Sequence, residues 1–255
     1  MLLAIDVGNT NIKFAFFQDE KIVRTFRLTT QTERTSDEFG MYIQGLSEDF
    51  GIKKDDIDGV VISSVVPNVM HALNNSIKKF LHLTPMIVGP GIKTGIKLVK
   101  TSPSEVGSDR IADGVAALNM YGGPVIVVDY GTATKFDYFS ADGVFESAVT
   151  CPGIVISARA LWNGTARLPE IEIKDPGTIM AKDTITSLQA GIMYGHIGEA
   201  EYIINRLKAE SKEKDIKVVA TGGLSNIISQ GTNAIQYVEP DLLMHGLRII
   251  YEKNK

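Results

Sequence analysis

A strand, an aspartate and a glycine-containing polar turn occur twice in this sequence, and this repeat constrains the fold more than any other feature. The first copy reads LLAIDVGNTNIKF over residues 2–14, and the second reads VIVVDYGTATKFD over residues 125–137. Asp6 and Asp129 lie in register, and each is followed two residues later by a glycine. A single Gly-Asn turn is typical of an ordinary β-hairpin. Its recurrence near the middle of the chain indicates an internal duplication.

The segments that follow each copy alternate between strand and helix patterns. The first half is expected to hold strands at 14–17, 21–28 and 59–67 and helices at 36–50 and 68–81. The second half is expected to hold strands at 136–139 and 143–149, a strand followed by a glycine turn over 216–225, and helices at 184–208 and from 226. This order predicts two α/β domains facing each other across a cleft. We place the boundary near residue 115, at a helix expected over 104–121, so the predicted domains are 1–115 and 116–255.

Composition favours an ordinary globular protein over one that binds nucleic acid or enters a membrane. The chain has 255 residues, 44% of them apolar, and a formal net charge of −4. This acidic balance argues against nucleic acid as the main partner. No apolar run has the length of a membrane span, and the start does not read as a signal peptide. The single cysteine, Cys151, excludes an internal disulfide and fits a reducing compartment, so we expect a cytoplasmic protein.

The two Asp-Gly turns have the composition of a phosphate-binding site, although neither is a Walker motif. Glycine lets backbone N–H groups approach phosphate oxygens. Lys13 is a candidate to neutralise charge on a transferred phosphoryl group, or else a solvated strand residue, and Asp6 is a candidate to hold Mg²⁺. Asp129 is a candidate for a second cation. The side chains expected to donate hydrogen bonds to phosphate are Asn9, Thr10, Thr132 and Thr134.

A third polar motif, EVGSDRIADGVAA over 105–117, is expected to begin a helix with Ser104 as its N-cap. Asp109 is the best candidate for a general base that accepts a proton from a substrate hydroxyl. Arg110 is a candidate anchor for a substrate anion. Alone, such a pair is more often a solvated ion pair, so these roles depend on the nearby phosphate turns. A weaker signal, the paired glycines in ATGGLS (220–225), fits either a close backbone approach to a ligand or a plain turn.

Four motifs, DVGNTNIK, GSDRIAD, VDYGTAT and ATGGLS, occur in this order, and together they resemble type III pantothenate kinase. That family belongs to the superfamily of acetate and sugar kinases, heat-shock chaperone ATPases and actin. The resemblance covers nearly the whole chain. It implies an α/β fold with two duplicated ribonuclease H-like domains of the actin/sugar kinase type facing a cleft. It also implies ATP-dependent phosphorylation of pantothenate to 4′-phosphopantothenate, the first step of coenzyme A biosynthesis.

The resemblance assigns roles to individual residues. Asp109 would be the proton acceptor, and Asp129 would ligate the monovalent cation, K⁺ or NH₄⁺, that the family requires beside Mg²⁺. The ATP phosphates would be bound by Asp6, Val7, Gly8, Asn9, Thr10, Asn11, Ile12, Lys13 and Thr132. The pantothenate site would be formed by Gly107, Ser108, Asp109, Arg110 and Thr184. The family is homodimeric, and a helix carrying Gly191, Gly195 and Gly198 would permit close contact at such an interface or serve internal packing.

Three departures from the family pattern lie on the substrate side. Ser147 and Ala148 replace a Gly-Gly pair, Lys100 stands where a tyrosine is usual, and IMAKDT (179–184) replaces Gly-Lys-Asn-Thr. They bear on pantothenate affinity more than on ATP binding. Two alternatives remain open: a kinase of another small hydroxy compound on this scaffold, and a non-catalytic nucleotide-binding regulator. The presence of Asp109 favours an enzyme, because a protein that only binds needs no base.

Overall fold

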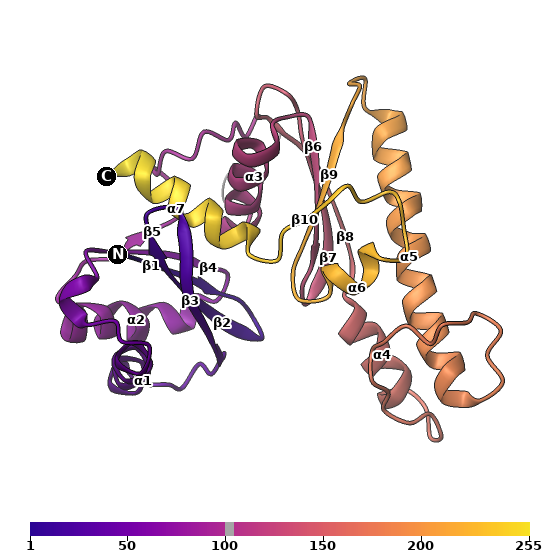
Figure 1. Ribbon diagram of the computed structural model, residues 1–255, viewed down its shortest axis with the longest axis horizontal. Helices are drawn as coiled ribbons and strands as arrows, with labels where there is room; N and C mark the ends of the chain where they lie inside the picture. The colour runs from indigo at the N-terminus through magenta and orange to yellow at the C-terminus, as the bar shows by residue number, and fades with distance from the viewer. Residues whose placement is uncertain (100–104) are drawn as a thin grey trace. The chain divides into compact units, whose positions relative to one another are not determined.

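The computed structural model describes residues 1–99 and 105–255, and this part of the chain contains two five-stranded sheets (Figure 1). The first sheet has the order β3-β2-β1-β4-β5. Its strands are β1 (Leu2–Val7), β2 (Asn11–Gln18), β3 (Lys21–Thr29), β4 (Gly59–Ser64) and β5 (Met86–Ile87). The second sheet has the order β8-β7-β6-β9-β10. Its strands are β6 (Val125–Tyr130), β7 (Ala133–Phe139), β8 (Phe145–Pro152), β9 (Lys217–Thr221) and β10 (Tyr237–Val238).

The two sheets have the same topology. In the first, β1 runs antiparallel to β2 and parallel to β4. In the second, β6 runs antiparallel to β7 and parallel to β9. The outer pairs match as well, because β3 and β8 are antiparallel to their neighbours and β5 and β10 are parallel to theirs. The repeat seen in the sequence is thus confirmed as a repeat of the sheet.

The described helices are distributed over both halves. Those of the first half are α1 (Ser36–Asp49), η1 (Lys54–Asp56), α2 (Pro67–Ser76), η2 (Ile77–Leu81) and α3 (Ser108–Tyr121). Those of the second half are α4 (Ile154–Asn163), α5 (Thr184–Glu210), α6 (Ser225–Ser229) and α7 (Leu242–Asn254). The helix expected over 104–121 therefore begins at Ser108, and its expected N-cap, Ser104, lies outside the described residues. None of the described helices has the length and apolar character needed to cross a membrane.

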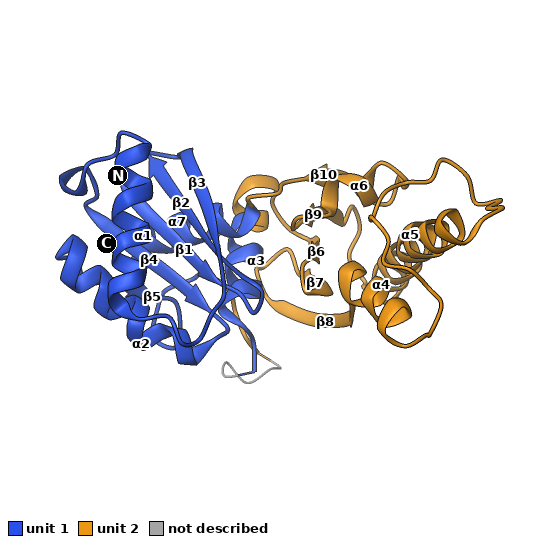
Figure 2. Ribbon diagram, turned by 90° about the horizontal axis from the view of Figure 1, so that it is seen from below, with its two compact units in different colours: residues 1–95, 101–116, 242–255 blue, residues 96–100, 117–241 orange. Residues whose placement is uncertain are grey.

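The chain forms two compact units, coloured blue and orange in Figure 2. The first unit comprises residues 1–95, 101–116 and 242–255, and the second comprises 96–100 and 117–241. The chain thus leaves the first unit within α3, close to the predicted boundary at residue 115. The units differ from the predicted domains in two segments, since residues 96–100 belong to the second unit and α7 belongs to the first. The division into domains at residue 115 remains a prediction.

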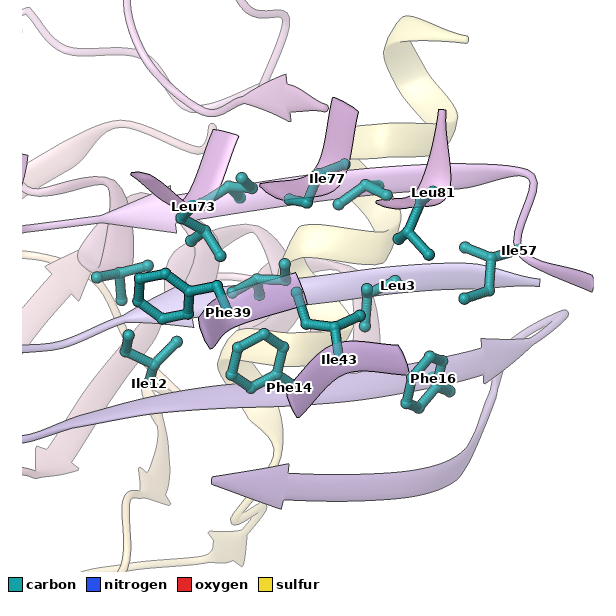
Figure 3. Packing of buried hydrophobic residues seen from close by; sticks show 14 of the residues in the cluster. Leu3, Ile12, Phe14, Phe16, Phe39, Ile43, Ile57, Leu73, Ile77 and Leu81 are labelled. Carbon is teal, nitrogen blue, oxygen red and sulfur yellow. The ribbon is translucent and has the colours of Figure 1, made fainter. Parts of the chain in front are cut away.

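One face of the first sheet carries the core of the first unit (Figure 3). Leu3 and Phe14, from β1 and β2, pack with Phe39 of α1 and Leu73 of α2, and all four are fully buried. Successive strand residues point to opposite faces of a sheet. Asp6 therefore faces away from this core.

The C-terminal helix α7 packs with the first unit through two glycines. A Cβ on Gly246 of α7 would lie 1.9 Å from the backbone oxygen of Ala112 in α3. A Cβ on Gly59 of β4 would lie 2.1 Å from the hydroxyl of Tyr251 in α7. Backbone and side chain can approach this closely only where no Cβ intervenes. These contacts fix α7 against both α3 and the sheet.

Candidate functional site

The first predicted phosphate turn is closed by its own backbone. The Gly8 N–H donates to the Asn11 carbonyl at 3.0 Å, and the Thr30 hydroxyl donates to the Gly8 carbonyl at 2.6 Å. A Cβ on Gly8 would lie 3.1 Å from the Asn11 oxygen, which explains why glycine suits this position. Asn9, Thr10 and Asn11 are exposed at the tip. Because the Gly8 N–H is used within the turn, the exposed tip is the part of this turn that presents surface to a ligand.

The register of the first sheet places charged and polar side chains beside Asp6. Asp6 pairs with Lys13 across the antiparallel β1–β2 ladder and with Ser63 across the parallel β1–β4 ladder. Side chains directly opposite each other in an antiparallel pair share a face and lie close together. The carboxylate and the ammonium therefore stand side by side at this edge of the sheet.

Two serine hydroxyls attach the start of α3 to the same edge. The hydroxyls of Ser63 and Ser108 are 2.9 Å apart, and the Ser64 N–H donates to the Ser108 oxygen at 3.2 Å. Since Ser63 is the register partner of Asp6, the next residue of α3, Asp109, is brought towards the end of β1. Ser108 was predicted to line the pantothenate site, and its hydroxyl is bonded to β4.

The side chain of Asp109 turns back over Gly107. A Cβ on Gly107 would lie 2.2 Å from Asp109 Oδ1, so a larger residue would displace the carboxylate. Asp109 and Arg110 are both half-buried in the first turn of α3. The structure thus groups Asp6, Lys13, Asp109 and Arg110 within one unit. A carboxylate, a lysine and an arginine near an exposed polar turn have the chemistry of phosphoryl transfer to a hydroxyl.

The second predicted turn contains a buried ion pair that the sequence analysis missed. Lys135 Nζ lies 2.7 Å from Asp129 Oδ2, and the two side chains are only 13% and 16% exposed. Register pairs Asp129 with Lys135 as it pairs Asp6 with Lys13, so the second turn is one residue shorter than the first. The sequence does contain a signal for this lysine, because a Lys-Phe dipeptide follows each turn. The two copies were aligned without a gap, and such an alignment does not bring the two dipeptides into register.

Thr134 was predicted to donate to phosphate, and this prediction is wrong. Its side chain is 1% exposed and lies on the core face of the second sheet, in line with Tyr130 across the β6–β7 ladder. Thr132, in the turn itself, remains the residue of this turn predicted to contact ATP.

Two glycines from distant segments pack against the second turn. A Cβ on Gly153, which precedes α4, would lie 2.2 Å from the Thr132 carbonyl oxygen. Gly222 has a φ of +91°, and a Cβ there would lie 2.6 Å from the Tyr130 carbonyl oxygen and 2.8 Å from Asp129 Oδ1. In ATGGLS, the backbone at Gly222 therefore packs closely against the second turn of the protein itself.

The oxygens beside Gly222 also fit a cation. Among the described residues no group of three His, Cys, Asp or Glu side chains could hold a metal ion. Hard cations such as K⁺ and Mg²⁺ prefer oxygen ligands, including backbone carbonyls. Asp129 Oδ1 and the Tyr130 carbonyl oxygen both lie within 3 Å of the position that a Cβ of Gly222 would take, so the two oxygens converge on one side of this turn. These two oxygens are candidate ligands for a monovalent cation.

Thr184, predicted to contact pantothenate, begins α5 in the second unit. Its neighbour Asp183 caps the helix by accepting the Thr186 N–H at 2.9 Å, and this hydrogen bond lowers the pKa of the Asp183 carboxyl. Thr184 lines a hollow of about 420 Å³. The other lining residues are Leu168, Ala181, Lys182, Asp183, Ser187 and Leu188. Thr184 and Asp109 belong to different units.

Comparison with known proteins decides the family. Residues 2–206 match the family described as Type III pantothenate kinase. A type III pantothenate kinase of Agathobacter rectalis is 51% identical over 99% of this chain and 97% of its own length. One of Listeria innocua is 45% identical over 100% of this chain and 98% of its own length. The chain belongs to the type III pantothenate kinase family.

Solved structures agree on the fold of this pantothenate kinase family member. A Baf family transcriptional activator of Campylobacter jejuni superimposes with a TM-score of 0.60 at 18% identity, covering 99% of this chain and 98% of that one. A 2-dehydro-3-deoxygalactonokinase protein of Sinorhizobium meliloti gives a TM-score of 0.59 at 11% identity, covering 99% and 96%. At these identities the likeness concerns the fold alone. It confirms the predicted duplicated α/β fold of the sugar kinase type.

The departures from the pantothenate kinase pattern can be placed in part. Ser147 and Ala148 are residues of β8 that pair with Tyr138 and Asp137 of β7. Lys182 of the IMAKDT segment lines the hollow beside Thr184. Lys100 lies outside the described residues. None of these departures alters the residues grouped around Asp6 and Asp109.

Proposed function

We propose that this member of the type III pantothenate kinase family catalyses ATP-dependent phosphorylation of pantothenate to 4′-phosphopantothenate, the first step of coenzyme A biosynthesis. One observation supports this most: the Ser63–Ser108 contact holds Asp109 at the edge of the sheet where Asp6 and Lys13 end. The proposed base Asp109 lies on α3, the cationic Lys13 on β2 and the carboxylate of Asp6 on β1, so each is carried by a regular element. Positioning and electrostatic stabilisation account for most of the catalysis of phosphoryl transfer.

Each charged residue has a distinct role in this proposal. Asp109 accepts the proton of the pantothenate hydroxyl as its oxygen attacks the terminal phosphorus of ATP. Lys13 and the exposed tip of the first turn stabilise the charge on the transferred phosphoryl group. Arg110 binds the pantothenate carboxylate, and Thr184 contributes a hydrogen bond. The residues that bind the ATP phosphates are Asp6, Val7, Gly8, Asn9, Thr10, Asn11, Ile12, Lys13 and Thr132.

Two cations complete the proposed site. Asp6 would hold Mg²⁺, and Asp129 with the Tyr130 carbonyl would hold K⁺ or NH₄⁺; these ions supply positive charge that neutralises the phosphates. Mg²⁺ would be held through the Asp6 carboxylate directly or through water. The proposal of a monovalent cation at Asp129 draws support from the two oxygens, Asp129 Oδ1 and the Tyr130 carbonyl, that converge beside Gly222.

We also propose a cytoplasmic homodimer that contacts itself through α5. Gly191, Gly195 and Gly198 recur on one face of this helix, and a Cβ on any of them would meet no atom of the described chain within 4 Å. Internal packing therefore gives no reason for these glycines. Exposed apolar side chains on the same and neighbouring elements include Ile185, Tyr202, Leu161 and Trp162. A close helix–helix contact between two copies would bury them.

A coupled assay of ADP release over a panel of small hydroxy compounds tests the function. With Mg²⁺ and K⁺ present, we expect turnover with pantothenate and not with other hydroxy acids. Turnover with another hydroxy compound alone would assign a different substrate to the same scaffold. Nucleotide binding without turnover on any compound would indicate a non-catalytic regulator. Either result would overturn the proposal.

A further inference from the structure

Five polar side chains gather on the core face of the second unit's sheet, the face opposite Asp129. Tyr130, Thr134 and His196 are buried, and Cys151 and Glu199 are partly exposed. Three come from neighbouring strands, where register aligns Tyr130 with Thr134 and Thr134 with Cys151. The other two, His196 and Glu199, come from α5, which packs on this face. The Glu199 charge acts on both Tyr130 and Cys151. None of the five has a role in the proposed reaction.

Four of these side chains have a buried polar atom without a hydrogen-bond partner among the described residues. The four atoms are Tyr130 Oη, Thr134 Oγ1, His196 Nδ1 and Glu199 Oε1. His196 Nδ1 and Glu199 Oε1 lie 3.5 Å apart, which is longer than a good hydrogen bond. Buried polar groups in native proteins are almost always paired, with protein or with ordered water. Four orphaned atoms at one place therefore indicate an occupant.

The donors and acceptors of the cluster suit water. Burial, and then the Glu199 charge, raise the pKa of the Tyr130 hydroxyl, so Tyr130 stays protonated and donates. Thr134 can also donate, whereas the carboxylate oxygens of a glutamate such as Glu199 serve as acceptors. A buried water typically makes about three hydrogen bonds and needs two to four polar partners. A water between these groups would accept from the hydroxyls and donate to the carboxylate.

The cluster lies directly behind the second turn. Tyr130 ends β6 and Thr134 is the second residue of β7, so they form the last pair before the turn that carries Gly131 and Thr132. The backbone carbonyl of Tyr130 is one of the oxygens beside Gly222. Whatever orders these two side chains also orders the turn.

We propose that Tyr130, Thr134, His196 and Glu199 form a buried water-binding site that holds the second turn in the position needed by Thr132 and Asp129. The four are positioning residues, because they act through the turn. The effect on ATP rests on the proposed kinase function, whereas the water site itself does not.

A crystal structure of the full chain at a resolution that shows ordered solvent tests the site directly. We expect a water within about 3.2 Å of at least two of the four orphaned atoms. A dry cluster, or side chains that pair directly with one another, would overturn the proposal even if the enzyme is fully active. Conversely, a protein without kinase activity that contains this water would contradict only the proposed function.

Two variants test the link to the turn. Tyr130→Phe and the isosteric Thr134→Val should each weaken ATP binding by about tenfold, the effect of one lost hydrogen bond of ordinary strength, measured by calorimetry. The double variant should lose less than the product of the two effects, because both hydroxyls bind the same water. Thr134→Val keeps the shape of the core, so it still tests the positioning role of these hydroxyls if Tyr130→Phe does not fold.

Tyr138→Phe is the matched control. Tyr138 lies on the same face of β7, but its hydroxyl is bonded to Ser211 and Glu213. Its loss should change stability and leave ATP affinity unchanged. Unchanged ATP affinity in Tyr130→Phe and Thr134→Val, or equal weakening in Tyr138→Phe, would refute the positioning role.

Discussion

At the residue scale, each turn sets an aspartate opposite a lysine. Asp6 and Lys13 are register partners beside an exposed tip, and Asp129 and Lys135 form a largely buried ion pair. Lys135 contacts Oδ2 of Asp129 and leaves Oδ1 facing Gly222. This arrangement fits the proposal that the first turn binds the reacting phosphate and that the second turn binds a cation.

Replacing Lys135 tests the cation site. In Lys135→Met, Asp129 loses its neighbouring positive charge, so we expect K⁺ to bind more tightly and to raise the melting temperature more than in the parent protein. The measurement is thermal unfolding across a K⁺ series at constant ionic strength. In Asp129→Ala this response should be absent. An identical K⁺ dependence in all three proteins would contradict a cation site at Asp129.

Replacing Asp109 tests the general base. Asp109→Asn keeps the shape of the side chain and removes its capacity to accept a proton. We expect kcat to fall by about 10²- to 10⁴-fold while ATP binding is retained, as measured by steady-state kinetics and calorimetry. Arg110→Ala should instead raise the KM for pantothenate with little change in ATP affinity. Near-normal turnover of Asp109→Asn would remove Asp109 from the mechanism.

At the scale of elements, local patterns predicted most of the fold and distant contacts account for the rest. Helix α1 and strand β4 have clear periodicity, and the structure places both within the ranges that the sequence predicts. The true start of α3 was missed, because it depends on a bond between Ser63 and Ser108 in different elements. The same holds for Lys135, whose place depends on turn length. Pairings across the sheet do not show in local periodicity.

The packing of α7 in the first unit also depends on a contact between residues distant in sequence. A substitution that adds one methyl group at this contact tests its importance. Gly246→Ala would bring a Cβ to 1.9 Å from the Ala112 oxygen, so the helix must shift. We expect a loss of about 1–3 kcal/mol in the free energy of unfolding, measured by chemical denaturation.

Gly45→Ala in α1 provides the control for this substitution. A Cβ on Gly45 meets no described atom within 4 Å, so alanine there should be neutral or stabilising by up to about 1 kcal/mol. Equal stability of Gly246→Ala and the parent protein would show that α7 does not depend on this contact.

At the scale of the whole molecule, one helix has two faces with opposite character. Ile192, His196 and Ala200 of α5 are buried against the second sheet, whereas Gly195 and Tyr202 face outwards. Tyr202 is 68% exposed, and a second copy of the chain packed on this face would cover it. Glycines at spacings of four and three residues allow two helices to approach closely, as a second copy of the chain would require.

Gly195→Leu tests whether the outer face of α5 joins two copies. Within one chain a Cβ at this position meets no described atom within 4 Å, so the variant should fold with a monomer melting temperature no lower than that of the parent protein. Between two copies it would separate the helices, and we expect the dissociation constant of the dimer to rise by at least about tenfold, measured by analytical ultracentrifugation. Gly45→Leu, on the exposed face of α1, should remain dimeric. A Gly195→Leu protein that dimerises as well as the parent would place the interface elsewhere on the molecule.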